Sequence, residues 1–217
     1  VERLRGRTST SGVRGMCQNR TVQDLSAIAP ISYMAQLTKD HATVSWYIPE
    51  AYGSPIRLKL YRADDPSTID TKWRTVQQFT IDQYEPGIRS LTLPSELLME
   101  GQVYAWQVEV DCNPLNASMN PYFVAQFRVV PSPNVSGKTP VEKAQIYADQ
   151  GLWYSAFSEA TTADQHGQKV RSRLLTELSK VETEQLQSNA QDFNAEEIKQ
   201  RVKQRQDQLS YLIQLTQ

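Results

Sequence analysis

Apolar and polar residues alternate with a period of two along most of residues 22–130, which predicts β-strands with one buried face. In residues 42–49, for example, three apolar side chains share one face, while Ser45 and Tyr47 share the other. This pattern predicts a half-buried strand. Turn signals such as Gly-Ser-Pro and Glu-Pro-Gly separate the segments. The strands expected in this way number seven: 25–28, 42–49, 56–61, 73–81, 88–93, 101–112 and 120–130.

The strand at 101–112 gives the clearest indication of the fold. Tyr104 and Trp106 lie on its apolar face, and Cys112 is in phase with them. A leucine and a glycine precede Tyr104, as in the tyrosine corner of immunoglobulin-like and fibronectin type III folds. The Trp46 strand, followed by a proline-bearing loop, also resembles a fibronectin type III strand. We therefore expect these three aromatic residues in the core of an antiparallel, all-β immunoglobulin/fibronectin type III-like sandwich.

The pattern changes after the proline-rich segment at 131–137, where a helical period of 3.6 replaces the period of two. Thr139 is a predicted N-cap, followed by a proline and a capping-box glutamate. Gly151 separates this helix from the next, and the turn resembles that of a tetratricopeptide hairpin. Two longer helices are expected near 167–187 and from Asn194 to about 215. Their apolar stripes predict either an antiparallel hairpin or a seam offered to a partner.

The fold class is thus an α+β organisation, with a sandwich followed by a C-terminal helical region of about four helices. The predicted segments are an extended basic arm at 1–21, the sandwich at 22–131, a linker at 132–139 and the helical region at 140–217.

Composition and motifs reduce the number of functional classes to be expected. The 217 residues carry a net charge of −1, which gives no reason to expect a nucleic-acid partner. No stretch is long and apolar enough to span a bilayer. The two histidines, His41 and His166, are isolated from each other and from the two cysteines, so no metal site or cofactor is expected. No nucleophile elbow or phosphate-binding glycine loop is present, so we expect no enzymatic activity.

The arm at 1–21 is polar and locally basic, because it contains Arg3, Arg5, Arg7, Arg14 and Arg20. We expect it to lie across the protein's own surface, although its charge would also suit an acidic partner. Cys17 in this arm and Cys112 are far apart in the sequence. From the residues alone they are either a disulfide or two separate buried thiols. The chain begins at Val1 without a methionine, which suits a mature exported protein, although an expressed fragment would begin in the same way.

Several segments resemble a cyanobacterial family that is known only as a domain of unknown function, number nine hundred and twenty-eight. The matching segments are 14–17, 45–49, 86–94, 104–114 and 147–156. Members of this family look like exported proteins, so the resemblance implies export and favours a disulfide between Cys17 and Cys112. The arm has serine and threonine where the family tends to have glycine, and the glutamine-rich tail after about residue 183 is longer than usual. The family has no established activity to transfer.

These observations favour an exported, non-enzymatic protein-interaction module in the periplasm, the cell envelope or the extracellular space. Its arm, sandwich loops and helices would present surface to a partner protein. The candidate partner-binding residues are Arg3, Arg5, Arg7, Arg14, Trp153 and Tyr154. One alternative is a structural subunit of a cell-surface filament, in which the arm adds a strand to a neighbouring sheet. A second is a carbohydrate-binding module that stacks sugar on Tyr47, Tyr61, Trp73 or Tyr122.

Overall fold

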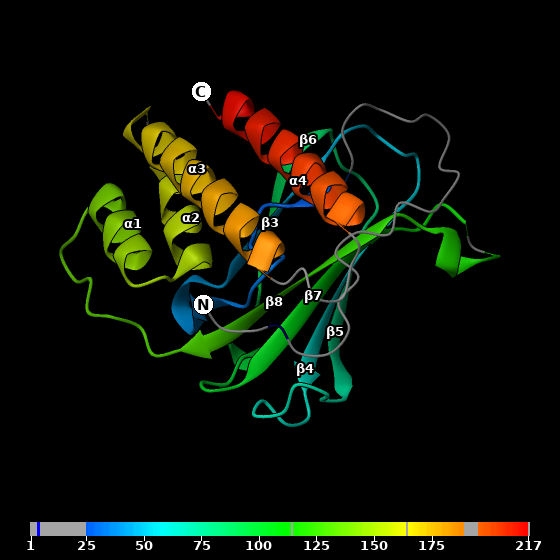
Figure 1. Cartoon of the computed structure of the whole chain (residues 1–217). Coiled ribbons are helices and arrows are strands. Elements are labelled where there is room, and N and C mark those ends of the chain that lie inside the picture. Colours follow the sequence, from blue (N-terminus) through cyan, green and yellow to red (C-terminus); the bar gives the residue numbers. More distant parts are fainter. Residues whose placement is uncertain (1–3, 5–24, 114, 164, 189–194, 217) are drawn as a thin grey trace.

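The computed structural model describes residues 4, 25–113, 115–163, 165–188 and 195–216. Within this part of the chain, eight strands precede four α-helices, so the fold is α+β with its helices at the C-terminal end. Figure 1 shows the helices gathered on one side and the larger sheet extending away from them. The segment predicted as a linker, 132–139, contains no helix or strand.

Seven of the strands coincide with the segments expected from the sequence, and the eighth, β2, was not expected. The strands are β1 (Ser26–Ala27), β2 (Ala35–Thr38), β3 (Thr43–Ile48), β4 (Ile56–Ala63), β5 (Trp73–Ile81), β6 (Gly87–Thr92), β7 (Val103–Val110) and β8 (Tyr122–Val130).

The strands form two sheets, with the orders β1-β3-β6 and β2-β8-β7-β4-β5. All neighbours are antiparallel except β2 and β8, which run parallel from Ala35 opposite Phe127 to Thr38 opposite Val130. The expectation of a purely antiparallel arrangement was therefore wrong at this edge. β2 spans four residues, too few to show a clear period of two, and its pairing with a strand some 90 residues later depends on tertiary structure.

One continuous hydrophobic core joins both sheets and the helices. Trp46 from the smaller sheet and Tyr104 and Trp106 from the larger one are at most 1% exposed. The Tyr104 hydroxyl donates a hydrogen bond to the Leu97 carbonyl (3.1 Å) and accepts one from Met99 N (3.0 Å). This side chain therefore fixes the bend of the chain that leads into β7.

The helices are α1 (Pro140–Asp149), α2 (Trp153–Thr162), α3 (Gln165–Ser188) and α4 (Ala195–Leu215). The predicted start of α1 is confirmed: Thr139 Oγ1 accepts from Glu142 N, the Glu142 carboxylate accepts from Thr139 N, and Pro140 is the first helical residue. Gly151 has a φ of 74°, which a residue with a side chain rarely adopts, so it allows the tight turn between α1 and α2. The predicted cap at Asn194 lies outside the described residues.

Helix α2 attaches the helical region to both sheets. Trp106 Nε1 donates to the Tyr154 hydroxyl at 2.9 Å, and Trp153 Nε1 donates to the Ile28 carbonyl at 3.2 Å. Thr38 N, in β2, donates to Ser155 Oγ at 3.2 Å. Three successive residues of α2 thus form hydrogen bonds with β7, with β2 and with the residue that follows β1. Helix α2 therefore links the helical region to both sheets.

Helices α3 and α4 form the antiparallel hairpin that was one of the two arrangements predicted for them. Ser172 near the start of α3 meets Thr216 just after α4, and Glu182 meets Arg205 farther along. Helix α4 also covers β3, since Tyr211 contacts Tyr47 through their rings (5.4 Å between centroids) and hydroxyls (3.1 Å). The expectation of a half-buried β3 was therefore wrong. Ser45 and Tyr47 are only 4% and 6% exposed.

Candidate functional site

A groove of about 390 Å³ lies between the α1–α2 turn and α3. Its floor is apolar and comes from both sides: α3 supplies the stripe Val170, Leu174, Leu178 and Val181, and the facing wall includes Ala148 and Trp153. The apolar stripe on α3 was expected from the sequence. Its position opposite the α1–α2 turn was not.

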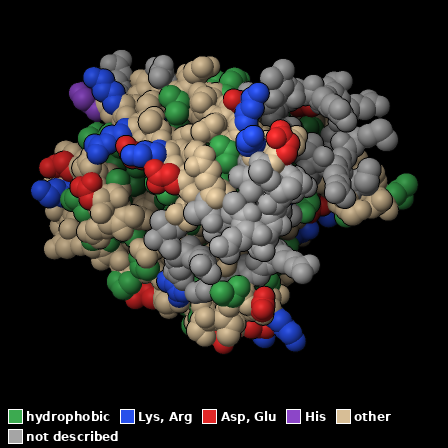
Figure 2. Space-filling view, in the orientation of Figure 1, with side chains coloured by type: hydrophobic (Ala, Val, Ile, Leu, Met, Phe, Trp, Pro, Cys, Tyr) green, Lys and Arg blue, Asp and Glu red, His purple; other side chains and the backbone are tan. Residues whose placement is uncertain are grey.

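Charged and polar side chains form the rim of this groove. Asp149 and Gln145 come from α1, and Arg173 and Glu177 come from α3; Arg173 Nη1 donates to Gln145 Oε1 at 3.4 Å. In Figure 2, acidic and basic side chains gather over α1 and α3 with hydrophobic side chains between them. An apolar centre with a polar rim that contains an arginine is the usual anatomy of a protein interface.

Close packing of α2 and α3 sets the shape of the groove. Gly167 lies so near α2 that a Cβ there would be 2.3 Å from the Ala160 carbonyl oxygen. The Arg171 guanidinium donates to that same oxygen at 2.6 Å. A glycine at this point therefore lets the start of α3 approach the end of α2, which places the apolar stripe of α3 beside the α1–α2 turn.

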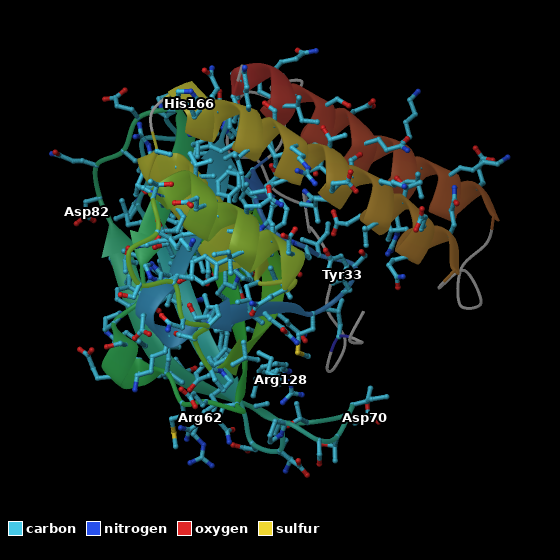
Figure 3. The ribbon with its side chains drawn as sticks, turned by 90° about the vertical axis from the view of Figure 1, so that its left-hand side faces the viewer. Tyr33, Arg62, Asp70, Asp82, Arg128 and His166 are labelled. Carbon is cyan, nitrogen blue, oxygen red and sulfur yellow. The ribbon has the colours of Figure 1, made fainter. Side chains whose placement is uncertain are left out.

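Tyr33 belongs to the segment between β1 and β2 and closes one end of the groove. In Figure 3 it lies below the α3–α4 hairpin, away from His166 at the start of α3. Burial is the main reason that the pKa of the Tyr33 hydroxyl is raised well above its usual range, and the nearby Glu182 carboxylate raises it further. Tyr33 therefore contributes a neutral phenol to the lining of the groove.

Trp153 and Tyr154, which were predicted to bind a partner, are both buried. Trp153 is 8% exposed and Tyr154 is 1% exposed, because both side chains are bonded into the interface between α2 and the strands. Trp153 reaches the floor of the groove, whereas Tyr154 contacts Trp106 and Phe127 in the core. Tyr33, Ala148 and Arg173 also line the groove and were not predicted from the sequence. The turn at Gly151 and the stripe on α3 could have indicated Ala148 and Arg173, whereas no local signal indicates Tyr33.

The predicted arm residues Arg3, Arg5, Arg7 and Arg14 lie outside the described residues, as does Cys17. Leu4 of the arm is described, and it is half-buried against the cluster of Met34, Ala63 and Val103. This contact agrees with an arm that lies on its own protein at that residue. Cys112 lies two residues after the end of β7, and its pairing with Cys17 remains a prediction.

The aromatic residues proposed to stack on sugar do not share one environment. Tyr47 is buried against Tyr211 and is unavailable to a ligand, which removes it from that hypothesis. Tyr61, Trp73 and Tyr122 are half-buried in three different strands.

A second cleft of about 380 Å³ lies where the chain passes from β5 to β6, and its lining includes Trp46, Tyr84 and Arg89. Arg89 Nε donates to the Glu85 carbonyl at 2.7 Å. The Trp46 indole nitrogen is buried and has no hydrogen-bond partner within the described part of the chain.

Among the described residues, no group of three or more His, Cys, Asp or Glu side chains converges as metal ligands would. His41 Nδ1 lies 3.1 Å from the Glu159 carboxylate at the junction of α1 and α2, where it contributes to packing beside the Tyr147 ring. None of the described helices combines the length and the apolar character that a membrane crossing requires.

The fold and the groove define a class: an α+β protein whose helical hairpins are fused to a two-sheet core. The chain belongs to the family described as Domain of Unknown Function (DUF928), whose model matches residues 9–192. The match covers both sheets and α1 to α3 and ends before α4. No curated protein matches the chain.

Proposed function

We propose that this chain is a non-enzymatic protein-interaction module that holds an apolar segment of a partner protein in the groove between the α1–α2 turn and α3. The observation that carries this proposal is the groove's combination of an apolar floor with a rim of Asp149, Arg173 and Glu177. Apolar side chains of a partner would displace water from the floor, and rim charges would fix the orientation of the segment.

We also propose that the module is exported and acts in the periplasm, the cell envelope or outside the cell. The family resemblance and the two distant cysteines support this compartment, because a disulfide between them would persist only in an oxidising environment.

For the sheet region we propose an immunoglobulin/fibronectin type III-like sandwich. The two-sheet order and the hydrogen bond from the Tyr104 hydroxyl to the Leu97 carbonyl support this assignment, since both are features of that architecture. In such folds binding function resides in surface sites rather than in the architecture itself.

The test compares capture of proteins from the envelope fraction of the source cells by the full chain and by two single variants. Val170→Asp places a charge on the apolar floor, and Thr176→Asp adds the same charge at an exposed position of α3 outside the groove. Circular dichroism first establishes that both variants are folded. We expect Val170→Asp to lose the captured protein and Thr176→Asp to retain it. Equal capture by both variants would refute binding in the groove.

A third variant that lacks residues 1–16 separates the groove from the arm. If the groove holds the partner, this truncated chain captures the same protein as the full chain. Loss of capture only on truncation would move recognition to the arm.

A further inference from the structure

At two edges of the sheets, side chains from the helices form hydrogen bonds with the backbone of the edge strand or of the residues next to it. Arg205 of α4 donates to the Ala27 and Ala29 carbonyls at 3.2 Å and 2.8 Å, at the edge formed by β1. Ser155 of α2 accepts from Thr38 N at the edge formed by β2. Backbone groups that another chain could pair with are therefore satisfied within the protein at these two edges.

The edge at β5 is different. β5 spans nine residues, more than any other edge strand, and β4 is its only neighbour among the described strands. Gln77, Gln78 and Thr80 are exposed, and Phe79 is half-buried. Arg74 is the only charged residue in β5, and the strand has no lysine or proline, the residues that commonly protect an edge from pairing.

A bulge divides β5 and limits the segment that can pair regularly. Gln77 lies opposite Leu60, but Thr75 lies opposite the next residue of β4, Tyr61. From Gln77 to Ile81 the alternation is unbroken, so Gln77, Phe79 and Ile81 share the face of the buried Leu58, while Gln78 and Thr80 share the other.

This five-residue segment is complementary to itself in an antiparallel arrangement. A two-fold axis at Phe79 places Phe79 opposite Phe79 of the second copy and Gln78 opposite Thr80 of the second copy. Each residue then faces one on the same side of the sheet, and no like charges are opposed. An aromatic cross-strand pair would also cover the half-buried Phe79 side chains.

We propose that β5 is the interface of a symmetric dimer, in which two copies of this chain join their five-stranded sheets through residues 77–81. A two-fold interface of this kind is closed, so it yields a dimer rather than a filament. In Figure 3 Asp82, which directly follows β5, and Tyr33 are well separated across the view. None of residues 77–81 is among the residues that line the groove.

The experiment uses the charge of the paired positions. One double variant carries Gln78→Lys and Thr80→Lys, and the other carries Gln78→Glu and Thr80→Glu; all four changes are at exposed positions. In the proposed register each variant alone opposes like charges twice, whereas a mixture of the two opposes unlike charges. We expect the wild type to dimerise in sedimentation equilibrium, each variant alone to dissociate at least about tenfold more readily, and the mixture to regain a 1:1 dimer.

The matched control is Thr176→Lys together with Gln200→Lys, two exposed positions on α3 and α4 rather than on a strand. This pair of changes leaves residues 77–81 intact, so dimerisation should persist if the variant is folded by circular dichroism. A wild type that stays monomeric up to several hundred micromolar overturns the proposal. So does a dimer that both double variants retain when each is studied alone.

Discussion

Glu182 of α3 and Arg205 of α4 form an ion pair (2.5 Å between Oε2 and Nε) that is buried on both sides, with side chains 0% and 4% exposed. The other carboxylate oxygen of Glu182 accepts from Ile31 N and Ser32 N, and Arg205 donates to the carbonyls next to β1. This pair therefore fixes the helical hairpin to the chain between β1 and β2, close to Tyr33 at the end of the groove.

Replacing Arg205 tests the importance of this contact. Arg205→Met leaves the buried Glu182 charge without its partner, so we expect the free energy of unfolding to fall by about 3–5 kcal/mol in urea titration. Lys203→Met on the exposed face of α4 is the control and should change it by less than about 0.5 kcal/mol. A similar small effect for Arg205→Met would show that the pair does not hold the hairpin in place.

Two buried tyrosines provide a matched pair of substitutions. Tyr154→Phe removes the acceptor for the Trp106 indole nitrogen and should cost about 1–3 kcal/mol of stability. The Tyr147 hydroxyl is buried without a hydrogen-bond partner among the described residues. Tyr147→Phe should therefore be neutral or stabilising. Thermal unfolding of the two variants checks the difference, and a larger loss for Tyr147→Phe would contradict it.

The sequence predicted elements that depend on local signals. The capping box at Thr139 and Glu142 defined the start of α1, and alternation defined β3, β4 and β7. It did not predict that Tyr47 would be covered, because its partner Tyr211 is more than 160 residues away. β2 was missed because four residues show too little alternation.

The groove was predictable only in part, because local sequence signals predict a helix and its apolar stripe but not what packs against that stripe. The stripe on α3 from Val170 to Val181 follows from helical periodicity, but the wall it faces depends on how α2 packs against α3 at Gly167. Trp153 and Tyr154 were predicted as partner-binding residues, because a single helix gives no indication of which of its faces a sheet will cover. Both side chains are buried.

The surroundings of Glu109 lead us to expect a specific pH dependence of the free energy of unfolding. Burial tends to raise the pKa of its carboxyl group. Hydrogen bonds from Asn120 and Lys59, together with the positive charges of Lys59 and Arg57, outweigh burial and lower the pKa below its ordinary value. A lowered pKa in the folded state means that the stabilisation is present above the unfolded pKa of about 4.3 and is lost as the pH falls through the folded value.

The Glu109→Gln variant should therefore lose less stability than the wild type between about pH 5 and about pH 3. Urea titrations at several pH values measure this difference. The control is Glu100→Gln at an exposed position, which should follow the wild-type curve. Parallel curves for Glu109→Gln and the wild type would contradict the assignment.

The predicted disulfide between Cys17 and Cys112 has two measurable consequences. Mass mapping of the non-reduced native protein should give a linked pair of peptides that contains both cysteines. The bridge would close a loop of about 95 residues, so Cys17→Ser and Cys112→Ser should each lower the free energy of unfolding by about 2–4 kcal/mol. Two free, titratable thiols in freshly isolated protein would disprove the bridge and weaken the case for export.

Site-specific photocrosslinking in the source cells tests most directly whether a partner protein binds in the groove between the α1–α2 turn and α3. Benzoylphenylalanine replaces Arg173 at the groove in one variant and Thr176, also exposed on α3 but outside the groove, in the other. A partner held in the groove should give one dominant adduct from position 173 and little from position 176. No adduct at position 173, or equal adducts from both positions, would contradict a binding groove at this place.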